Sequence, residues 1–539
     1  MPTVRDVTFN LLRKLGLTTI VGNPGSTEET FLQNFPKDFT YILTLQESSV
    51  VGIADGLAQG LKKPIIVNVH TGAGMGNAMG CILTAHVNKT PLIITAGQQT
   101  REMLLMEPFL TDVEAVNLPK PWVKWSYEPA RPEDVPGAFM RAYAMAIQQP
   151  MGPVFLSLPL DDWNKEMDDS DAYRTVCTRI APDPQRISEF ANTINQSKNP
   201  VLVYGGDISR SNAWDLGIQF AEKLNAPVWL SPFSERISFP ENHSLYAGAL
   251  PAAIGPLSKK LEGHDLVIVI GAPVFRYYPW VPGKYLPKGA KLIQVTDDPY
   301  DAAKSAVGDS IVCDSGLALS ALCEMIESRQ SNTNKVTKPE KTFEVPGKDA
   351  KHPLTAAQVY GLLSQKLPED YILVQESPSN IPELSNSRLG VVTKPDSYYT
   401  MGSGGLGWDM PAAVGLALAE KRTGRNRPVI VVMGDGSFQY SPQAIWTGVQ
   451  HDLHIVILAL RNEEYGILKS FAVLEKTPKV PGLDLPGLDI VSLAKGYGAK
   501  AVSAKMMDEI ESEFLKALSE KGTTVIEIPI DKKVKALLR

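Results

Sequence analysis

The chain contains 539 residues, 44% of them hydrophobic and 21% charged, with a formal net charge of −6; the length predicts two to four domains and the composition is that of a globular protein. Acidic and basic residues are interspersed, and no stretch of about 18 apolar residues occurs, so we expect neither a nucleic-acid partner nor a membrane span. The N-terminus lacks the apolar core of a signal peptide, and four widely spaced cysteines (Cys81, Cys177, Cys313 and Cys323) show no metal-ligand or disulfide pattern, which predicts a cytoplasmic protein.

Helices and buried strands alternate along the predicted chain. Residues 3–16 and 508–521 carry the apolar period of amphipathic helices. The signal repeated elsewhere is a short, continuous apolar run that ends in Gly, Pro or a polar turn. Such runs occupy 64–69, 91–97, 153–159, 200–206, 226–232, 265–273, 291–299, 371–377, 427–437, 454–462 and 523–530. Runs without period-2 alternation are typical of strands buried on both faces, so we expect parallel sheets covered by helices and an α/β fold.

Two polar stretches interrupt this alternation. Residues 160–185 contain an acidic cluster, and residues 328–352 are almost free of large apolar side chains, so both are predicted to be linkers. They divide the chain into three α/β domains, with predicted boundaries 1–180, 181–340 and 341–539.

Two strand ends in the last third carry polar residues at a spacing suited to a metal ion. The run 429–433 leads into Gly434-Asp435-Gly436, and Asn462 follows the run 455–460. The crossover between parallel strands brings Asp435 and Asn462 to one edge of the sheet, where ligands bind. Carboxylate and amide oxygens suit Mg²⁺ or Ca²⁺, with diphosphate oxygens completing the coordination shell. The alternative is that the Asp-Gly pair forms an ordinary turn.

This spacing resembles the signature of thiamine diphosphate enzymes, in which Gly-Asp-Gly is followed by a run ending in Asn-Asn; here Arg461 replaces the first Asn. Further stretches resemble the benzoylformate decarboxylase branch of that family. They occupy 22–26, 46–47, 51–56, 76–80, 96–101, 123–128, 271–277 and 493–498. The resemblance implies three doubly wound parallel-sheet domains, namely pyrimidine-binding, central and diphosphate-binding, with thiamine diphosphate and Mg²⁺ or Ca²⁺ as cofactors.

The resemblance also implies a set of cofactor ligands in the last domain. Asp435, the Asn462 side chain and the main-chain carbonyl of Glu464 would hold the metal ion. The Gly404 carbonyl would accept from the aminopyrimidine, and Leu406 would lie beneath the bent cofactor. Further cofactor contacts are implied for Gly436, Ser437 and Tyr465. Without the resemblance, residues 404–407 are equally well explained as a glycine-rich turn with a core leucine.

Three residues of the first domain are implied to be catalytic. Glu47 lies among small and apolar residues, which predicts a buried carboxyl, and by resemblance it hydrogen-bonds the aminopyrimidine ring; alternatively it is a surface acid at a helix start. His70 follows the predicted strand 64–69 and would handle protons during the reaction, although a lone His is more often structural. Ser26 would contact the substrate carboxylate, unless it is only a helix N-cap.

The chain departs from this branch at three positions that line the implied substrate pocket. Tyr278 stands where the family has a second active-site His, Thr400 replaces a Phe, and Ile467 replaces an Ala. A Tyr hydroxyl can donate a proton but seldom accepts one. The pocket is implied to comprise Leu110, Tyr278, Thr400, Ile467, Leu468 and Phe471. A lost aromatic wall and added bulk lead us to expect an aliphatic or smaller 2-oxo acid.

The function expected from these features is the non-oxidative decarboxylation of a 2-oxo acid to an aldehyde and CO₂ by a thiamine-diphosphate-dependent carboxy-lyase. The alternatives are an acetohydroxyacid-synthase-like carboligase and a non-catalytic cofactor-binding member. A nicotinamide enzyme is disfavoured because residues 72–76 do not give the required glycine spacing. The family places Glu47 and Asp435 on different subunits, so we expect a homodimer as the active unit, within a homotetramer.

Overall fold

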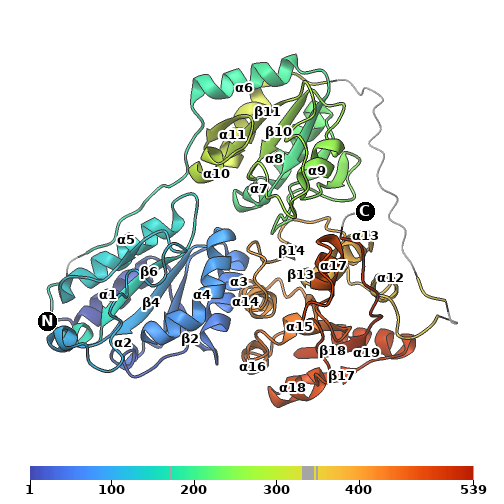
Figure 1. The fold of residues 1–539 in the computed structure, drawn as a ribbon. Helices are drawn as coiled ribbons and strands as arrows, with labels where there is room; N and C mark the ends of the chain where they lie inside the picture. Colours follow the sequence, from blue (N-terminus) through green and yellow to red (C-terminus); the bar gives the residue numbers. More distant parts are fainter. Residues whose placement is uncertain (170, 330–344, 348–349, 538–539) are drawn as a thin grey trace. The chain divides into compact units, whose positions relative to one another are not determined.

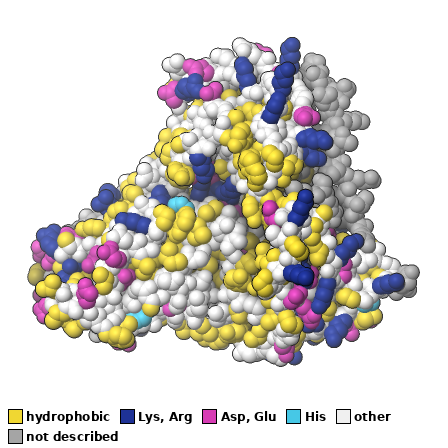
Figure 2. Space-filling view, viewed as in Figure 1, with side chains coloured by type: hydrophobic (Ala, Val, Ile, Leu, Met, Phe, Trp, Pro, Cys, Tyr) yellow, Lys and Arg dark blue, Asp and Glu magenta, His cyan; other side chains and the backbone are white. Residues whose placement is uncertain are grey.

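The computed structural model describes the whole chain except residues 170, 330–344, 348–349 and 538–539. The backbone forms three six-stranded sheets flanked by helices (Figure 1), which confirms the predicted α/β class. Most of the predicted linker 328–352 lies outside the described residues. No helix in the described part of the chain combines the length and apolar character needed to cross a bilayer. Acidic and basic side chains are interspersed on the face drawn in Figure 2.

The three sheets fall into two compact units. The first unit comprises Met1–Val176, Phe343–Gly390 and Ser403–Arg539, and it contains the first sheet and most of the third. The second unit comprises Cys177–Thr342 and Val391–Gly402, and it contains the central sheet. The boundaries 1–180, 181–340 and 341–539 stay a prediction.

The first sheet has the strand order β2-β1-β3-β4-β6-β5, and all of its pairings are parallel. Its strands are β1 Thr19–Gly22, β2 Thr40–Leu43, β3 Ile65–Val69, β4 Leu92–Gln98, β5 Ser126–Tyr127 and β6 Val154–Pro159. Its helices are α1 Val4–Lys14, α2 Glu29–Leu32, α3 Glu47–Leu61, α4 Thr71–Val87, η1 Arg101–Met106, η2 Pro132–Asp134, α5 Val135–Ile147 and η3 Asp162–Asn164. The chain order reverses between β1 and β3, and the carboxyl ends of such strands flank the crevice in which α/β sheets bind ligands.

The third sheet repeats this topology. Its order β13-β15-β16-β18-β17 corresponds to β1-β3-β4-β6-β5, a duplication that no repeat in the sequence predicted. The strands are β13 Ile372–Glu376, β14 Tyr398–Tyr399, β15 Val429–Gly434, β16 Ile455–Arg461, β17 Lys500–Ser503 and β18 Thr523–Pro529, of which β14 belongs to the second unit. The helices are α12 Ala356–Leu363, η4 Pro378–Asn380, α13 Ile381–Asn386, α14 Asp409–Thr423, α15 Asp435–Phe438, α16 Ala444–Gln450, α17 Gly466–Leu474, α18 Ile490–Gly496 and α19 Met507–Ser519.

The central sheet has the order β12-β11-β10-β7-β8-β9, which places its own switch point between β7 and β10. Its strands are β7 Pro200–Tyr204, β8 Val228–Leu230, β9 Tyr246–Ala249, β10 Leu266–Ile270, β11 Lys291–Thr296 and β12 Asp309–Val312. Its helices are α6 Pro184–Gln196, α7 Gly206–Arg210, α8 Trp214–Leu224, α9 Ile254–Lys260, α10 Pro299–Ala303 and α11 Ser315–Met325.

The predicted linker 160–185 is only partly a linker. Trp163 and Met167 are buried in the core of the first domain, and Thr3 forms an isolated bridge with Glu166. The described residues from 168 to 183 contain no helix or strand. The prediction that the linker begins at residue 160 is therefore wrong. The large apolar side chain of Trp163 is stabilised by burial in the first domain, which a linker does not provide.

Helices α3 and α14 pack closely inside the first unit. A Cβ on Gly56 would lie 2.1 Å from the Ala412 carbonyl oxygen, and a Cβ on Gly415 would lie 2.1 Å from the Ile53 carbonyl oxygen. The indole of Trp408 also donates to the buried Asp55 carboxylate across 2.6 Å. The two glycines therefore allow the backbones of α3 and α14 to approach closely. This contact joins the first domain to the third.

Candidate active site

A buried carboxylate, Glu28, organises the edge of the first sheet beside β1 and β3. Its Oε1 accepts hydrogen bonds from the Gly97 amide (2.7 Å) and the Thr27 hydroxyl (2.8 Å), and its Oε2 accepts one from the Gly25 amide (2.8 Å). The Nδ1 of His70 lies 2.9 Å from the same Oε2. Because the carboxylate can only accept here, we assign the proton to Nδ1, which leaves Nε2 available for proton exchange with a ligand.

The His70 ring closes against the turn that follows β1. His70 comes directly after β3 and is 22% exposed. A Cβ on Gly25 would lie 2.2 Å from His70 Nδ1, so glycine is required where the turn meets the ring. Ser26 is exposed in the same turn. The structure therefore brings the predicted residues Ser26 and His70 together at the switch point of the first sheet.

Glu47 is the first residue of α3, and its side chain is buried as predicted. One carboxylate oxygen accepts from the Asn23 side-chain amide (3.0 Å), and the other accepts from that of Asn77 (3.1 Å). Asn23 belongs to the turn after β1 and Asn77 to α4. Two donors from different elements therefore fix the orientation of the carboxylate.

Asp435 occupies the corresponding edge of the third sheet, directly after β15. Its Oδ1 accepts from the Gly436 amide (2.8 Å), and its Oδ2 accepts from the Glu463 amide (2.6 Å) in the turn after β16. Glu463 has a φ of +56°, a left-handed conformation that non-glycine residues adopt mainly where the surroundings impose it. Burial raises the pKa of Asp435 to about 6, and a bound cation would stabilise its charged form.

Asn462 lies at the same edge, because β15 and β16 are parallel neighbours. Its Oδ1 accepts from the Glu464 amide at 3.3 Å, while the Glu464 carboxylate pairs with Lys469. In the described part of the chain, no group of three His, Cys, Asp or Glu side chains is placed to hold a metal ion. The available donors are one carboxylate, one amide and a main-chain carbonyl, and Mg²⁺ is commonly bound by few protein ligands together with phosphate and water oxygens. The donor set fits the expected metal.

Gly436 and Ser437 continue from Asp435 into α15. A Cβ on Gly436 would lie 2.6 Å from the Tyr465 ring, so the missing side chain lets the aromatic ring approach. Ser437, the next residue, is buried. The Tyr465 hydroxyl is partly desolvated, which raises its pKa. The predicted cofactor contacts Gly436, Ser437 and Tyr465 therefore lie beside Asp435.

Glu376, at the end of β13, holds the glycine-rich loop in front of α14. Its two oxygens accept from the Gly407 amide (2.6 Å) and the Asp409 amide (2.9 Å). Burial raises the pKa of Glu376 to about 7, although these backbone donors oppose the rise. The loop contains the predicted residues Gly404, which has a φ of +76°, and Leu406, which is half-buried. Glu376 therefore fixes the segment expected to lie under the cofactor.

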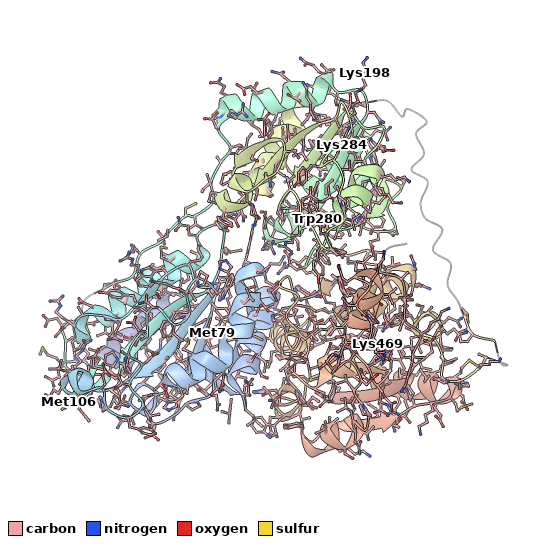
Figure 3. The ribbon with its side chains drawn as sticks, in the orientation of Figure 1. Met79, Met106, Lys198, Trp280, Lys284 and Lys469 are labelled. Atoms are coloured by element: carbon pink, nitrogen blue, oxygen red, sulfur yellow. The ribbon has the colours of Figure 1, made fainter. Side chains whose placement is uncertain are left out.

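The predicted pocket residues divide between the two units. Ile467, Leu468 and Phe471 lie on α17, the helix that carries Lys469 in Figure 3, and Leu110 follows η1. Tyr278 and Thr400 belong to the second unit. Tyr278 lies in the loop between β10 and β11 and is 56% exposed, whereas Thr400 is half-buried after β14. The structure therefore places Ile467, Leu468, Phe471 and Leu110 in the first unit and Tyr278 and Thr400 in the second, and the pocket itself stays a prediction.

Four polar residues of these clusters were missed by the sequence analysis, namely Asn23, Glu28, Asn77 and Glu376. Asn23 and Asn77 fall within stretches that resemble the family, but nothing in the sequence links them to Glu47. Glu28 and Glu376 are single acidic residues near strand ends, and that position was the only feature of the sequence that could have indicated a role in the site. Their partners are backbone amides, and a sequence does not show which amides a carboxylate meets.

Strand-end clusters lie on two sheets of the same topology, and one of them offers the carboxylate and amide oxygens that a metal ion holding a diphosphate requires. These features are typical of an enzyme that binds a diphosphate cofactor through a metal ion. Three family models of thiamine pyrophosphate enzymes match the chain: the N-terminal binding domain at residues 2–116, the central domain at 187–322 and the C-terminal binding domain at 385–528.

Comparison with individual proteins gives the same family. The chain is 42% identical over 533 residues to benzoylformate decarboxylase of Pseudomonas aeruginosa, covering 98% of this chain and 99% of the relative. The crystal structure of benzoylformate decarboxylase from Polynucleobacter necessarius is 60% identical, with a TM-score of 0.97 and full coverage of both chains. A probable acetolactate synthase large subunit of Methanocaldococcus jannaschii is 26% identical, covering 98% of this chain and 91% of the relative.

The chain therefore belongs to the thiamine pyrophosphate enzyme family, as a thiamine-diphosphate-dependent carboxy-lyase of the benzoylformate decarboxylase type. Its cofactors are thiamine diphosphate and a divalent metal ion such as Mg²⁺ or Ca²⁺.

Proposed function

We propose that this enzyme converts a 2-oxo acid to an aldehyde and CO₂, with a preference for an aliphatic or smaller acid over benzoylformate. The observation that carries the proposal is the pair of strand-end clusters, one around Glu47 and His70 and one around Asp435 and Asn462. In this proposal residues 1–180 bind the pyrimidine ring, 181–340 form the central domain and 341–539 bind the diphosphate.

The side chains then have separate tasks. Thiamine diphosphate, when bound, supplies the nucleophilic carbon and the electron sink that decarboxylation requires. Asp435, Asn462 and the Glu464 carbonyl hold the metal ion. Glu47 holds a proton at the pyrimidine ring, in an orientation that its two amide donors support. His70 exchanges protons with the reacting molecule through Nε2, which its bond to Glu28 leaves available.

The substrate contacts follow from the remaining residues. Ser26 is exposed beside His70, where its hydroxyl can donate to the substrate carboxylate. Tyr278 would donate the proton that the family's second His supplies. Thr400 removes an aromatic wall and Ile467 adds bulk near the reacting carbon, and such changes shift discrimination by about 1–3 kcal/mol.

Release of aldehyde and CO₂ from a panel of 2-oxo acids tests the function. We expect release only when thiamine diphosphate and Mg²⁺ are both present, and chelation of the metal should abolish it. The highest kcat/KM should belong to a 2-oxoalkanoate rather than to benzoylformate. A higher kcat/KM for benzoylformate than for every aliphatic acid would refute the proposed preference while leaving the decarboxylase intact.

The panel also separates the second candidate, a carboligase of the acetohydroxyacid synthase type. That candidate is favoured only by the similarity of the acetolactate synthase relative. A carboligase would give a coupled hydroxyketone as the main product and little free aldehyde. Detection of that product in place of aldehyde would reverse the assignment.

We further propose a homodimer as the active unit, within a homotetramer. Apolar side chains are exposed along the segment that carries Leu110, including Leu105 (97%) and Phe109 (88%); Met106 of the same segment is labelled in Figure 3. Exposed apolar patches of this kind mark interaction sites, and a second copy of this chain is the occupant that would complete a pocket containing Leu110. Four free cysteines support a location in the reducing cytoplasm.

A further inference from the structure

A buried ion-pair cluster lies at the carboxyl edge of the central sheet, next to the switch point between β7 and β10. Glu235 forms its centre and is 3% exposed. Its Oε1 lies 2.7 Å from Arg210 Nη1, and its Oε2 lies 3.0 Å from Arg276 Nη1. Arg210 also pairs with Asp207 at 2.6 Å. A Cβ on Gly206 would lie 2.2 Å from Glu235 Oε1, so the carboxylate fills the edge at which sheets of this order bind ligands.

The two arginines keep Glu235 charged. Burial alone would raise the pKa of this carboxyl, but the charges of Arg210 and Arg276 outweigh burial and hold the pKa below its usual range. Removal of the carboxylate charge would leave both guanidinium groups without their shared partner. Arg210 would keep its pair with Asp207, whereas Arg276 would lose the carboxylate that holds it.

Arg276 connects this cluster to the loop that carries Tyr278. Besides its contact with Glu235, Arg276 Nη1 donates to the Phe233 carbonyl oxygen at 2.9 Å. Tyr278 follows two residues later, and Trp280 of the same loop is labelled in Figure 3. The direction in which this loop leaves β10 is therefore set by acceptors on the turn that contains Glu235.

The same turn holds the segment that carries Thr400. The Thr400 amide donates to the Glu235 main-chain oxygen at 3.2 Å. The neighbouring residue, Arg236, lies 3.6 Å from Asp396 Oδ1, and its guanidinium lies 5.1 Å from the centre of the Tyr399 ring. Three contacts from two consecutive residues therefore fasten this segment within the second unit.

We propose that Glu235 is a positioning residue that sets the placement of Tyr278 and Thr400, and so determines which 2-oxo acid these two residues accept. This inference rests on the proposed function, because that function makes Tyr278 and Thr400 substrate contacts. Glu235 itself touches neither substrate nor cofactor. The Glu235 carboxylate holds the Tyr278 loop through Arg276, and the Glu235 main-chain oxygen accepts from the Thr400 amide. One residue therefore contacts both segments, which is the supporting role that precise substrate sites require.

The test compares Glu235→Gln with Asp314→Asn in the full-length holoenzyme. Asp314 is a matched control because it is also buried in the second unit and pairs with an arginine, Arg179, at 2.7 Å, while it caps α11, an element apart from residues 275–281 and 396–401. Both variants should lower the midpoint of thermal unfolding. Only Glu235→Gln should change the ratio of kcat/KM for benzoylformate to kcat/KM for pyruvate, by tenfold or more, with thiamine diphosphate affinity unchanged.

Amide hydrogen exchange provides a readout that does not depend on activity. In Glu235→Gln, peptides covering 275–281 and 396–401 should exchange at least tenfold faster, because Arg276 loses its charged partner and the turn whose main-chain oxygen accepts from the Thr400 amide is no longer held by two ion pairs. The control should leave both peptides unchanged. Equal exchange in wild type and Glu235→Gln, or equal changes in both variants, would overturn the inference. A wild-type enzyme that releases no CO₂ would instead overturn the proposed function, and exchange alone would then decide the role of Glu235.

Arg276→Gln serves if Glu235→Gln does not fold. Its side chain is partly exposed, and its loss leaves Glu235 paired with Arg210. Faster exchange in 275–281, with 396–401 unchanged, would support the inference that the Tyr278 loop and the Thr400 segment are held separately, each by its own contact with Glu235. Unchanged exchange in 275–281 would overturn the inference that Glu235 positions the Tyr278 loop through Arg276.

Discussion

Glu28 is the residue whose contribution to the first-domain cluster can be measured most directly. Glu28→Gln keeps the shape of the side chain but replaces one acceptor oxygen with an NH2 group among four donors. Either the Nδ1 proton of His70 loses its acceptor or the side chain loses the Gly97 and Thr27 donors that hold it in place. We expect kcat to fall about 10- to 100-fold, which is part of the effect of a positioned acid–base group. Substrate affinity should change less than kcat, because Glu28 contacts His70 directly, whereas it meets the turn that carries Ser26 through the Gly25 amide. Steady-state kinetics with the best 2-oxo acid would measure this split.

The adjacent residue provides the control for this prediction. Glu29 is exposed in the first turn of α2, so Glu29→Gln should leave kcat unchanged and alter the free energy of unfolding by about 0.5 kcal/mol or less. Equal kcat values for Glu28→Gln and Glu29→Gln would show that the orientation of His70 does not depend on the carboxylate.

At the residue scale, the sequence predicted the position of a site residue where that residue directly follows a predicted strand. Asp435 and Asn462 were predicted from their places after two apolar runs, and they lie at one edge because β15 and β16 are neighbours. The amides that hold Glu47 come from a turn and a helix 24 and 30 positions away, and a sequence does not contain that distance information. The predicted roles of the site residues remain predictions.

At the element scale, the close packing of α3 against α14 can be tested by adding one methyl group at the contact. Gly56→Ala would place its Cβ 2.1 Å from the Ala412 carbonyl oxygen, so one helix must move. Overpacking of this kind costs about 1–3 kcal/mol, which should appear as a lower midpoint of thermal unfolding monitored by circular dichroism. The control is Gly137→Ala on α5, where nothing lies within 4 Å of the added carbon. That change should stabilise the protein by about 0.5–1 kcal/mol, and a loss equal to that of Gly56→Ala would contradict the packing argument.

The same scale shows which elements the sequence could predict. All eleven continuous apolar runs contain a strand, since burial on both faces requires such runs. Edge strands were harder, because β2, β12 and β17 are partly exposed and β5 and β14 have two residues each. The shared topology of the first and third sheets was also missed, because strand order depends on contacts between distant segments.

At the scale of the whole molecule, the question is whether one catalytic site uses residues from two copies of the chain. Mixing two inactive variants, Glu47→Gln and Asp435→Asn, answers it. If Glu47 of one copy works with Asp435 of another, each mixed dimer contains one site with both changes and one site with neither. Random pairing at equal amounts makes half of the dimers mixed, so activity should recover to about a quarter of the wild-type value after co-expression. If both residues of a site belong to one chain, every site keeps one change and no activity returns, which would refute the shared site without affecting the assignment of the cofactor.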